Sequence, residues 1–247
     1  MLLASTAILA ALVAFGDSTT ADRKGVTTYA ARLEAALGIP VINAGVPGNH
    51  TEDARRRFNR DVLAHRPAVV IIQFGLNDAA VDVWKKPPAS GPRVRVESYR
   101  RNLAFFIAGV REQGGAAILM TPNPMAWTPR LRELYGKPPY DTGTEEGINR
   151  PLTAYVHAVR EVAHRLDVPL VDVYSTFSGN PQGVSALLLD GMHPNNTGHA
   201  IIAELLLPAV RRLADLNGRA GLPHLDTASH SGRGSGARRP VRCYRAP

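Results

Sequence analysis

Ile8-Leu9-Ala10-Ala11-Leu12-Val13-Ala14-Phe15 is an apolar run that leads directly into Gly16-Asp17-Ser18-Thr19. A short apolar run bounded by turn residues is typical of a strand that is buried on both faces. We therefore predict a strand over 8–15 that presents Ser18 at its carboxyl end. In an open parallel sheet these ends border the ligand crevice, so the serine hydroxyl is well placed for chemistry. The same residues also form good turns and caps, and the stretch alone does not decide between the two roles.

The rest of the chain repeats this strand-then-turn pattern, with stretches of helical periodicity in between. Tyr29, Leu33 and Leu37, for example, recur on one helix face, and Gly38 follows as a C-cap. Strands that alternate with helices in this way predict a parallel sheet covered by helices on both faces. The other predicted strands are 39–43, 68–74, 116–121 and 168–174.

Two long connections interrupt this order, at 79–96 and 122–147, and both contain several prolines. The second carries Trp127, Tyr135 and Tyr140. Aromatic side chains in such loops either line a sugar or acyl pocket or pack the loop itself. The sequence leaves both interpretations open.

Length and charge limit the classes of protein to consider. At 247 residues the chain is long enough for one α/β domain, which we place at 1–218. Of the net charge of +8, +5 comes from six arginines and one aspartate in 219–247. The rest carries no basic stripe, so we predict no nucleic-acid partner. Segment 219–247 has no periodicity and is rich in Gly, Ser, Arg and Pro, and we expect a disordered basic tail.

The cellular location and the oligomeric state stay open at this stage. The single cysteine, Cys243, allows no disulfide within the chain. The apolar start, 1–15, superficially resembles a signal peptide, but it has no basic region before it and is too short to span a membrane. We interpret it as part of the first strand. The protein is then cytoplasmic as written, or secreted if an upstream leader is missing.

The turns after the strands carry the residues that nucleophilic catalysis needs. A serine becomes a nucleophile when an imidazole takes its proton, and the imidazole needs a carboxylate on its other nitrogen. Asp190 and His193 stand three residues apart across Gly191, so a tight turn can fold the carboxylate back onto the ring. Because the carboxyl ends of parallel strands share one edge of the sheet, we expect Ser18 and His193 to meet there.

Acyl transfer also requires hydrogen-bond donors for the oxyanion of the tetrahedral intermediate. The candidates are the backbone amides of Ser18 and Gly48 and the side-chain amide of Asn77, since each of these residues follows a predicted strand. Glycine at position 48 also lets the backbone approach a substrate closely. Gly45 is a competing candidate in the same loop.

Taken together, these turns resemble the motif blocks of the SGNH/GDSL hydrolase superfamily, in order and at plausible distances over residues 8–214. The first block differs from the family's Gly-Asp-Ser-Leu by having Thr19, as in carbohydrate acetylesterase branches. The resemblance implies a flavodoxin-like three-layer α/β/α sandwich with a five-stranded parallel sheet, and ester hydrolysis without a metal or cofactor. The blocks are Gly16-Asp17-Ser18-Thr19, Asn43-Ala44-Gly45-Val46-Pro47-Gly48-Asn49, Gly75-Leu76-Asn77-Asp78 and Asp190-Gly191-Met192-His193-Pro194.

The resemblance assigns a role to each candidate residue. Ser18 resembles the family's nucleophile, His193 its base and Asp190 the acid that orients the base. Gly48 and Asn77, with the Ser18 amide, resemble the oxyanion hole. Within this alignment Gly45 is a turn glycine.

We therefore expect a serine esterase that acts on short-chain, chiefly acetyl, esters of carbohydrates or small alcohols. One alternative is a lipase, lysophospholipase or thioesterase of the same fold that takes longer acyl chains. Another is a non-catalytic carbohydrate- or nucleotide-binding flavodoxin-like module. Against a nucleotide site, the first loop contains neither Gly-x-Gly-x-x-Gly nor a Walker-type Gly-Lys-Ser/Thr.

Several polar residues near these motifs have a simpler interpretation. Asp17 and Asp78 are expected to tie loops together through backbone amides, a common habit of aspartate. His50 is expected to be a solvated histidine at the rim. The other histidines in helical stretches lack a second ligand at zinc spacing, so we predict no metal site; they are His65, His157, His164 and His199.

Overall fold

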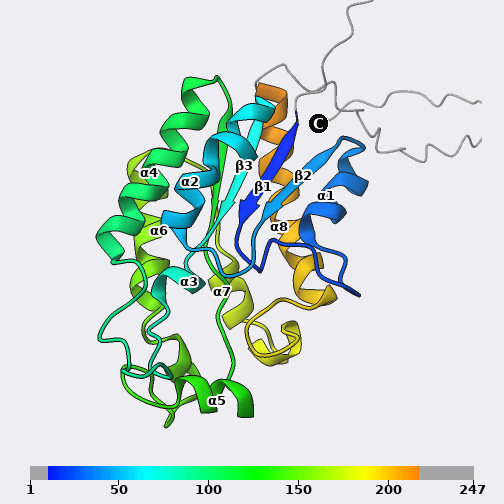
Figure 1. Ribbon diagram of the computed structural model, residues 1–247. Coiled ribbons are helices and arrows are strands. Elements are labelled where there is room, and N and C mark those ends of the chain that lie inside the picture. Colours follow the sequence, from blue (N-terminus) through cyan, green and yellow to red (C-terminus); the bar gives the residue numbers. More distant parts are fainter. Residues whose placement is uncertain (1–10, 217–247) are drawn as a thin grey trace, which may run out of the picture.

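The computed structural model describes residues 11–216, which form a three-layer α/β/α sandwich around one parallel sheet (Figure 1). The sheet order β2-β1-β3-β4-β5 is that of flavodoxin-like folds. The predicted fold class is confirmed. The strands are β1 (Leu12–Gly16), β2 (Val41–Gly45), β3 (Val69–Gln73), β4 (Ala116–Met120) and β5 (Leu170–Val171).

Alternate residues of β1 point into different helical layers, because successive side chains of a strand face opposite sides of the sheet. Val13 and Phe15 pack in the layer of α2, α4 and α6. Leu12 and Ala14 pack in the layer of α1 and α8. In Figure 1 the two layers lie on opposite sides of the sheet. These helices are α1 (Tyr29–Leu37), α2 (Thr51–Asp61), α4 (Val96–Glu112), α6 (Thr153–Arg165) and α8 (Asn196–Leu216).

Short helical segments gather at the carboxyl edge of the sheet, toward which the strand arrows in Figure 1 point. They belong to the connections that follow the strands, including the two long ones noted in the sequence. The candidate site described below lies between the aligned strand ends and these connections. The segments are α3 (Leu76–Ala79), α5 (Pro129–Tyr135), α7 (Val173–Ser178), and the 3₁₀ turns η2 (Glu145–Asn149) and η3 (Val184–Leu187). A further 3₁₀ turn, η1 (Leu63–His65), lies between α2 and the start of β3, at the opposite edge.

The predicted fifth strand, 168–174, is wrong over most of its length. Only Leu170–Val171 pairs with β4, and helix α7 begins at Val173. Asp172 explains the early end, because its side chain accepts a hydrogen bond from the Ser175 amide (3.1 Å) and caps α7. An apolar pattern of this length fits a strand and a short buried helix equally well.

Other predicted boundaries shift by a few residues. β1 begins at Leu12, and the residues before 11 lie outside the described part of the chain. The predicted tail, 219–247, also lies outside it. Within 11–216, no helix combines the length and the apolar character that crossing a bilayer requires.

Candidate active site

Ser18 lies in a tight turn at the carboxyl end of β1. The carboxylate of Asp17 accepts hydrogen bonds from the Thr19 amide (2.8 Å) and hydroxyl (2.9 Å), and this holds the turn. Asp17 is completely buried, which raises its pKa although the Thr19 hydrogen bonds oppose the shift. Asp17 therefore has the turn-forming contacts that the sequence suggested, while the Ser18 side chain is left partly exposed.

A second turn, between Leu188 and α8, brings Asp190 and His193 together. One oxygen of Asp190, Oδ1, accepts hydrogen bonds from the amides of Met192 (3.1 Å) and His193 (2.9 Å). The other oxygen, Oδ2, lies 2.8 Å from His193 Nδ1. Burial opposes ionisation of Asp190, but the hydrogen bonds from the His193 amide and ring outweigh it and lower the pKa of this carboxyl. The carboxylate is thus ionised where it faces the ring.

The two turns meet at the edge of the sheet. His193 Nε2 lies 2.9 Å from Ser18 Oγ, on the side of the ring opposite Asp190. When Nδ1–H donates to the Asp190 carboxylate, Nε2 carries the lone pair and accepts the hydrogen bond of the serine hydroxyl. The predicted convergence of Ser18, His193 and Asp190 is therefore present, with the connectivity of a serine–histidine–aspartate triad.

The predicted oxyanion donors lie in turns that follow β1, β2 and β3 at this edge of the sheet. Within the described residues, the amides of Ser18 and Gly48 donate to no protein acceptor. Asn77 lies in α3, and its Nδ2 is 3.5 Å from Asp17 Oδ2, next to the turn that holds Ser18. Gly45 is unsuited to the role, because its amide donates to Asn43 Oδ1 (3.0 Å).

The two glycines of this loop are required for different reasons. Gly48 has φ +79° and nothing within 4 Å of the position a Cβ would take, so the backbone conformation rather than crowding within the chain demands glycine. At Gly45, a Cβ would lie 2.2 Å from the Ala21 nitrogen. Gly45 ends β2 and is a close-packing residue, not the turn glycine that we expected.

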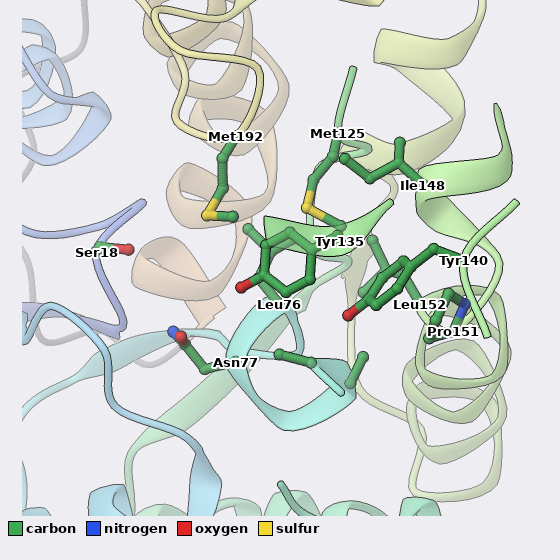
Figure 2. A pocket seen from close by; sticks show the side chains of 12 residues that line it. Ser18, Leu76, Asn77, Met125, Tyr135, Tyr140, Ile148, Pro151, Leu152 and Met192 are labelled. Carbon is green, nitrogen blue, oxygen red and sulfur yellow. The ribbon is translucent and has the colours of Figure 1, made fainter. Parts of the chain in front are cut away.

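A small cavity of about 50 Å³ lies beside Ser18 and Asn77 (Figure 2). Figure 2 shows these two residues on one side and the Tyr135 ring between them and the far wall. Two of the three aromatic residues of the 122–147 connection therefore line the cavity, whereas Trp127 lines a separate hollow. The lining residues are Ser18, Leu76, Asn77, Ala79, Ala80, Met125, Tyr135, Tyr140, Ile148, Pro151, Leu152 and Met192.

His50 has a structural contact that the sequence did not suggest. Its Nδ1 accepts from the Asp53 amide while the Asp53 carboxylate accepts from the His50 amide (both 3.4 Å). His50 is thus the N-cap of α2 rather than a histidine without structural contacts. The amide and the hydroxyl of Thr51 both donate to Asp78, so Asp78 has the expected contact with a backbone amide and ties the start of α2 to α3.

The motif blocks and this geometry agree with a comparison against known families. The model of the GDSL-like Lipase/Acylhydrolase family matches residues 14–201. The chain belongs to this family. The resemblance drawn from the sequence is confirmed, and this GDSL-family protein is a carboxylic ester hydrolase.

Individual relatives of this GDSL-family protein are moderately similar to it. The uncharacterised lipoprotein YqeF of Bacillus subtilis (strain 168) is 34% identical over 203 residues, which cover 76% of this chain and 82% of the relative. An acetylxylan esterase of Geobacillus stearothermophilus is 28% identical over 177 residues, covering 69% and 72%. The crystal structure of the lipase/acylhydrolase from Enterococcus faecalis has a TM-score of 0.61 at 27% identity and covers 87% of this chain and 98% of that one.

Sequence reasoning missed part of the site of this GDSL-family protein. Met192 could have been predicted as a lining residue, because it stands inside the Asp190–His193 motif. Met125 could have been suspected, since it follows β4 at the same sheet edge. Arg93, which donates a hydrogen bond to Asn77 Oδ1 (3.0 Å), comes from a connection without periodicity, and no sequence signal pointed to it.

Proposed function

We propose that this protein is a serine esterase that hydrolyses short-chain, chiefly acetyl, esters of carbohydrates or small alcohols through an acyl-enzyme on Ser18. The observation that carries the proposal is the continuous hydrogen-bonded chain from Ser18 Oγ through the His193 ring to Asp190, with distances of 2.9 and 2.8 Å. A serine, a base and an orienting acid in this order are what two-step acyl transfer requires.

In this mechanism Ser18 attacks the ester carbonyl while His193 Nε2 accepts its proton. The new oxyanion takes hydrogen bonds from the Ser18 and Gly48 amides and from the side chain of Asn77. His193 then gives its proton to the leaving alcohol, which leaves the acyl group on Ser18. Water attacks this acyl-enzyme, with His193 again as base, and releases the acid. Asp190 stabilises the imidazolium in both steps.

The size of the cavity beside Ser18 supports a short acyl group. At about 50 Å³ it is far smaller than the hollow of about 680 Å³ nearby, so it suits a small acyl group better than a long chain. The far wall contains Ile148 and Leu152, both buried. The carbohydrate part of the proposal is supported by the acetylxylan esterase relative and by Thr19 in the first motif block.

The nucleophile is tested with Ser18→Ala on p-nitrophenyl acetate. We expect kcat to fall by on the order of 10⁴, because loss of one triad member removes the concerted step. Ser90→Ala, on an exposed loop, is the matched control and should retain the wild-type rate. A folded Ser18→Ala variant that works as fast as wild type would refute the proposal.

A larger apolar hollow keeps the longer-chain alternative in view. It measures about 680 Å³ and shares Ala79 and Pro151 with the small cavity. A series of p-nitrophenyl esters from acetyl to palmitoyl separates the two candidates. Under the short-chain proposal kcat/KM falls steeply beyond butyryl, and Leu152→Ala extends the accepted length. A maximum at octanoyl or longer in the wild type would favour the lipase or thioesterase alternative.

A further inference from the structure

The orientation of the Asn77 side chain is constrained at both ends of its amide. Its oxygen, Oδ1, accepts a hydrogen bond from Arg93 Nη1 at 3.0 Å, and its nitrogen, Nδ2, lies 3.5 Å from Asp17 Oδ2. A half-turn of the amide would exchange oxygen and nitrogen. The amino group would then face a guanidinium, which can only donate, and the oxygen would face a carboxylate. The surroundings therefore favour one of the two orientations.

Only that orientation is useful to an oxyanion. An oxyanion is stabilised by an N–H donor, whereas the amide oxygen in the same place would repel it. Asn77 and Ser18 lie on the same side of the cavity in Figure 2. A cation on the Asn77 oxygen also polarises the amide, and this strengthens the donor at the other end.

Arg93 is itself firmly placed. Its Nη2 and Nε donate to Asp82 at 2.7 and 3.2 Å, and the Asp82 side chain is only 4% exposed. The backbone on either side is anchored as well, since the Arg93 amide donates to Ala80 (3.0 Å) and the Val94 amide donates to Asp78 (3.1 Å). All three nitrogens of the guanidinium thus donate hydrogen bonds, two to Asp82 and one to Asn77. The single nitrogen of lysine cannot reproduce this geometry.

We propose that Arg93, anchored by Asp82, is a positioning residue that orients the side chain of Asn77 so that its N–H group faces the oxyanion. This inference rests on the proposed function, in which Asn77 is an oxyanion donor. Arg93 acts through Asn77 and does not itself contact the reacting atoms. Its effect must therefore disappear when the Asn77 amide is removed.

A double-mutant cycle with p-nitrophenyl acetate tests this dependence. Asn77→Ala should lower kcat by roughly 10²–10³, as for other oxyanion-hole side chains. Arg93→Ala should lower kcat by on the order of tenfold with little change in KM, because the interaction it supports is made in the transition state. In the Asn77→Ala background, Arg93→Ala should change kcat by less than about twofold.

Two further variants sharpen the cycle. Lys85→Ala removes another cation from Asp82, to which Lys85 lies at 2.7 Å, but leaves the contact between Arg93 and Asn77 intact, so it should retain the wild-type rate. Arg93→Lys keeps the charge but not the three-nitrogen geometry, and its kcat should stay well below wild type. It also replaces Arg93→Ala in the cycle should the alanine variant fail to fold.

The outcomes are distinct. Three results would each overturn the inference and leave the proposed function intact. The first is an equal loss of kcat from Arg93→Ala in the wild-type and the Asn77→Ala backgrounds. The others are a wild-type kcat in Arg93→Lys and no loss of kcat in Arg93→Ala. The Ser18→Ala variant is assayed alongside. If it were fully active, the proposed function itself would fail, whatever the cycle showed.

Discussion

At the scale of single residues, Asp78 is an unusual group to find beside a catalytic site. It is fully buried, and its Oδ1 accepts hydrogen bonds from the amide and hydroxyl of Thr51. Its Oδ2 has no hydrogen-bond partner within the described residues. Burial, with a smaller contribution from the negative charge of Asp17, raises the pKa of Asp78 to about 7. The carboxyl is therefore about half protonated in the folded protein at pH 7 and largely protonated at lower pH.

This raised pKa makes stability depend on pH in a defined direction. Because the folded state binds the proton more tightly than the unfolded state, the contribution of Asp78 is fully present below about pH 4 and is lost as pH rises through about 7. Asp78→Asn keeps an acceptor for Thr51 and cannot ionise. The free energy of unfolding of wild type relative to Asp78→Asn should thus fall by up to about 4 kcal/mol over this window. Urea unfolding at pH 4, 5.5 and 7.5 measures it; a constant difference would contradict the assignment.

At the scale of elements, the turn from Asp190 to His193 depends on Gly191. This residue has φ +84°, and a Cβ would lie 2.4 Å from the Ala126 oxygen and 2.7 Å from Thr128 Cγ2. The Ala126 amide in turn donates to the Gly191 oxygen at 2.8 Å, which fastens the turn to the connection after β4. The position of the His193 ring is therefore set by packing between two connections.

Gly191→Ala should displace this turn and with it His193. We expect kcat on p-nitrophenyl acetate to fall by at least about tenfold, in addition to a loss of roughly 1–3 kcal/mol in unfolding free energy from the backbone conformation. Gly183→Ala is the matched control, because its φ is +80° but nothing lies within 4 Å of the Cβ position. It should lose stability but keep its activity per folded molecule. Similar losses of activity in both variants would show that the close approach of Ala126 and Thr128 to Gly191 does not position His193.

Most elements could be predicted because hydrophobic periodicity is a local signal. The runs that form β1 and β3 are almost wholly apolar and end at turn residues. The apolar run and the turn that follows it therefore both indicated a strand at each place. The stretch after Val168 misled us because the side chain of Asp172 caps a helix there, and that contact depends on the Ser175 amide rather than on the pattern of apolar residues. Boundaries set by a single polar contact are harder to predict than elements set by a repeated pattern.

At the scale of the whole molecule, Arg57 of α2 joins the two strand ends next to the site. It donates to the backbone oxygens of Gly16 in β1 and Ala44 in β2, both at 2.8 Å, and to Asn49 Oδ1 at 2.7 Å. Its guanidinium also lies 4.7 Å from the centroid of the Phe15 ring. One side chain thus connects the end of β1, the loop after β2 and helix α2.

Arg57→Lys should be costly although the charge is kept. A lysine ammonium cannot reach these three acceptors together, and buried acceptors that lose a charged donor cost free energy. We expect a loss of about 2–4 kcal/mol in unfolding free energy by urea denaturation. Arg56→Lys is the control, since that side chain is 74% exposed on the same helix, and it should change stability by less than about 0.5 kcal/mol. Equal effects of the two substitutions would contradict the role of Arg57.

Much of the candidate site could be predicted because strand order brings distant turns to one edge. Ser18 and Asn77 stand in turns that follow β1 and β3, whose carboxyl ends the parallel sheet aligns, and His193 stands in the turn before α8. Arg57, Arg93 and the walls of the cavity could not be predicted in this way. Arg57 lies on a helix with several exposed arginines, and Arg93 reaches Asn77 only through the path of a proline-rich connection. Such contacts depend on the complete fold.

The most direct measurement of the central claim is covalent labelling with a p-nitrophenyl phosphonate, followed by peptide mass analysis. An activated serine should take up one phosphonyl group per chain on Ser18, with release of one p-nitrophenolate and parallel loss of esterase activity. His193→Ala should slow the labelling by orders of magnitude, since the hydroxyl then lacks its base. Labelling of a different residue, or an active wild-type enzyme that resists labelling at Ser18, would contradict the account.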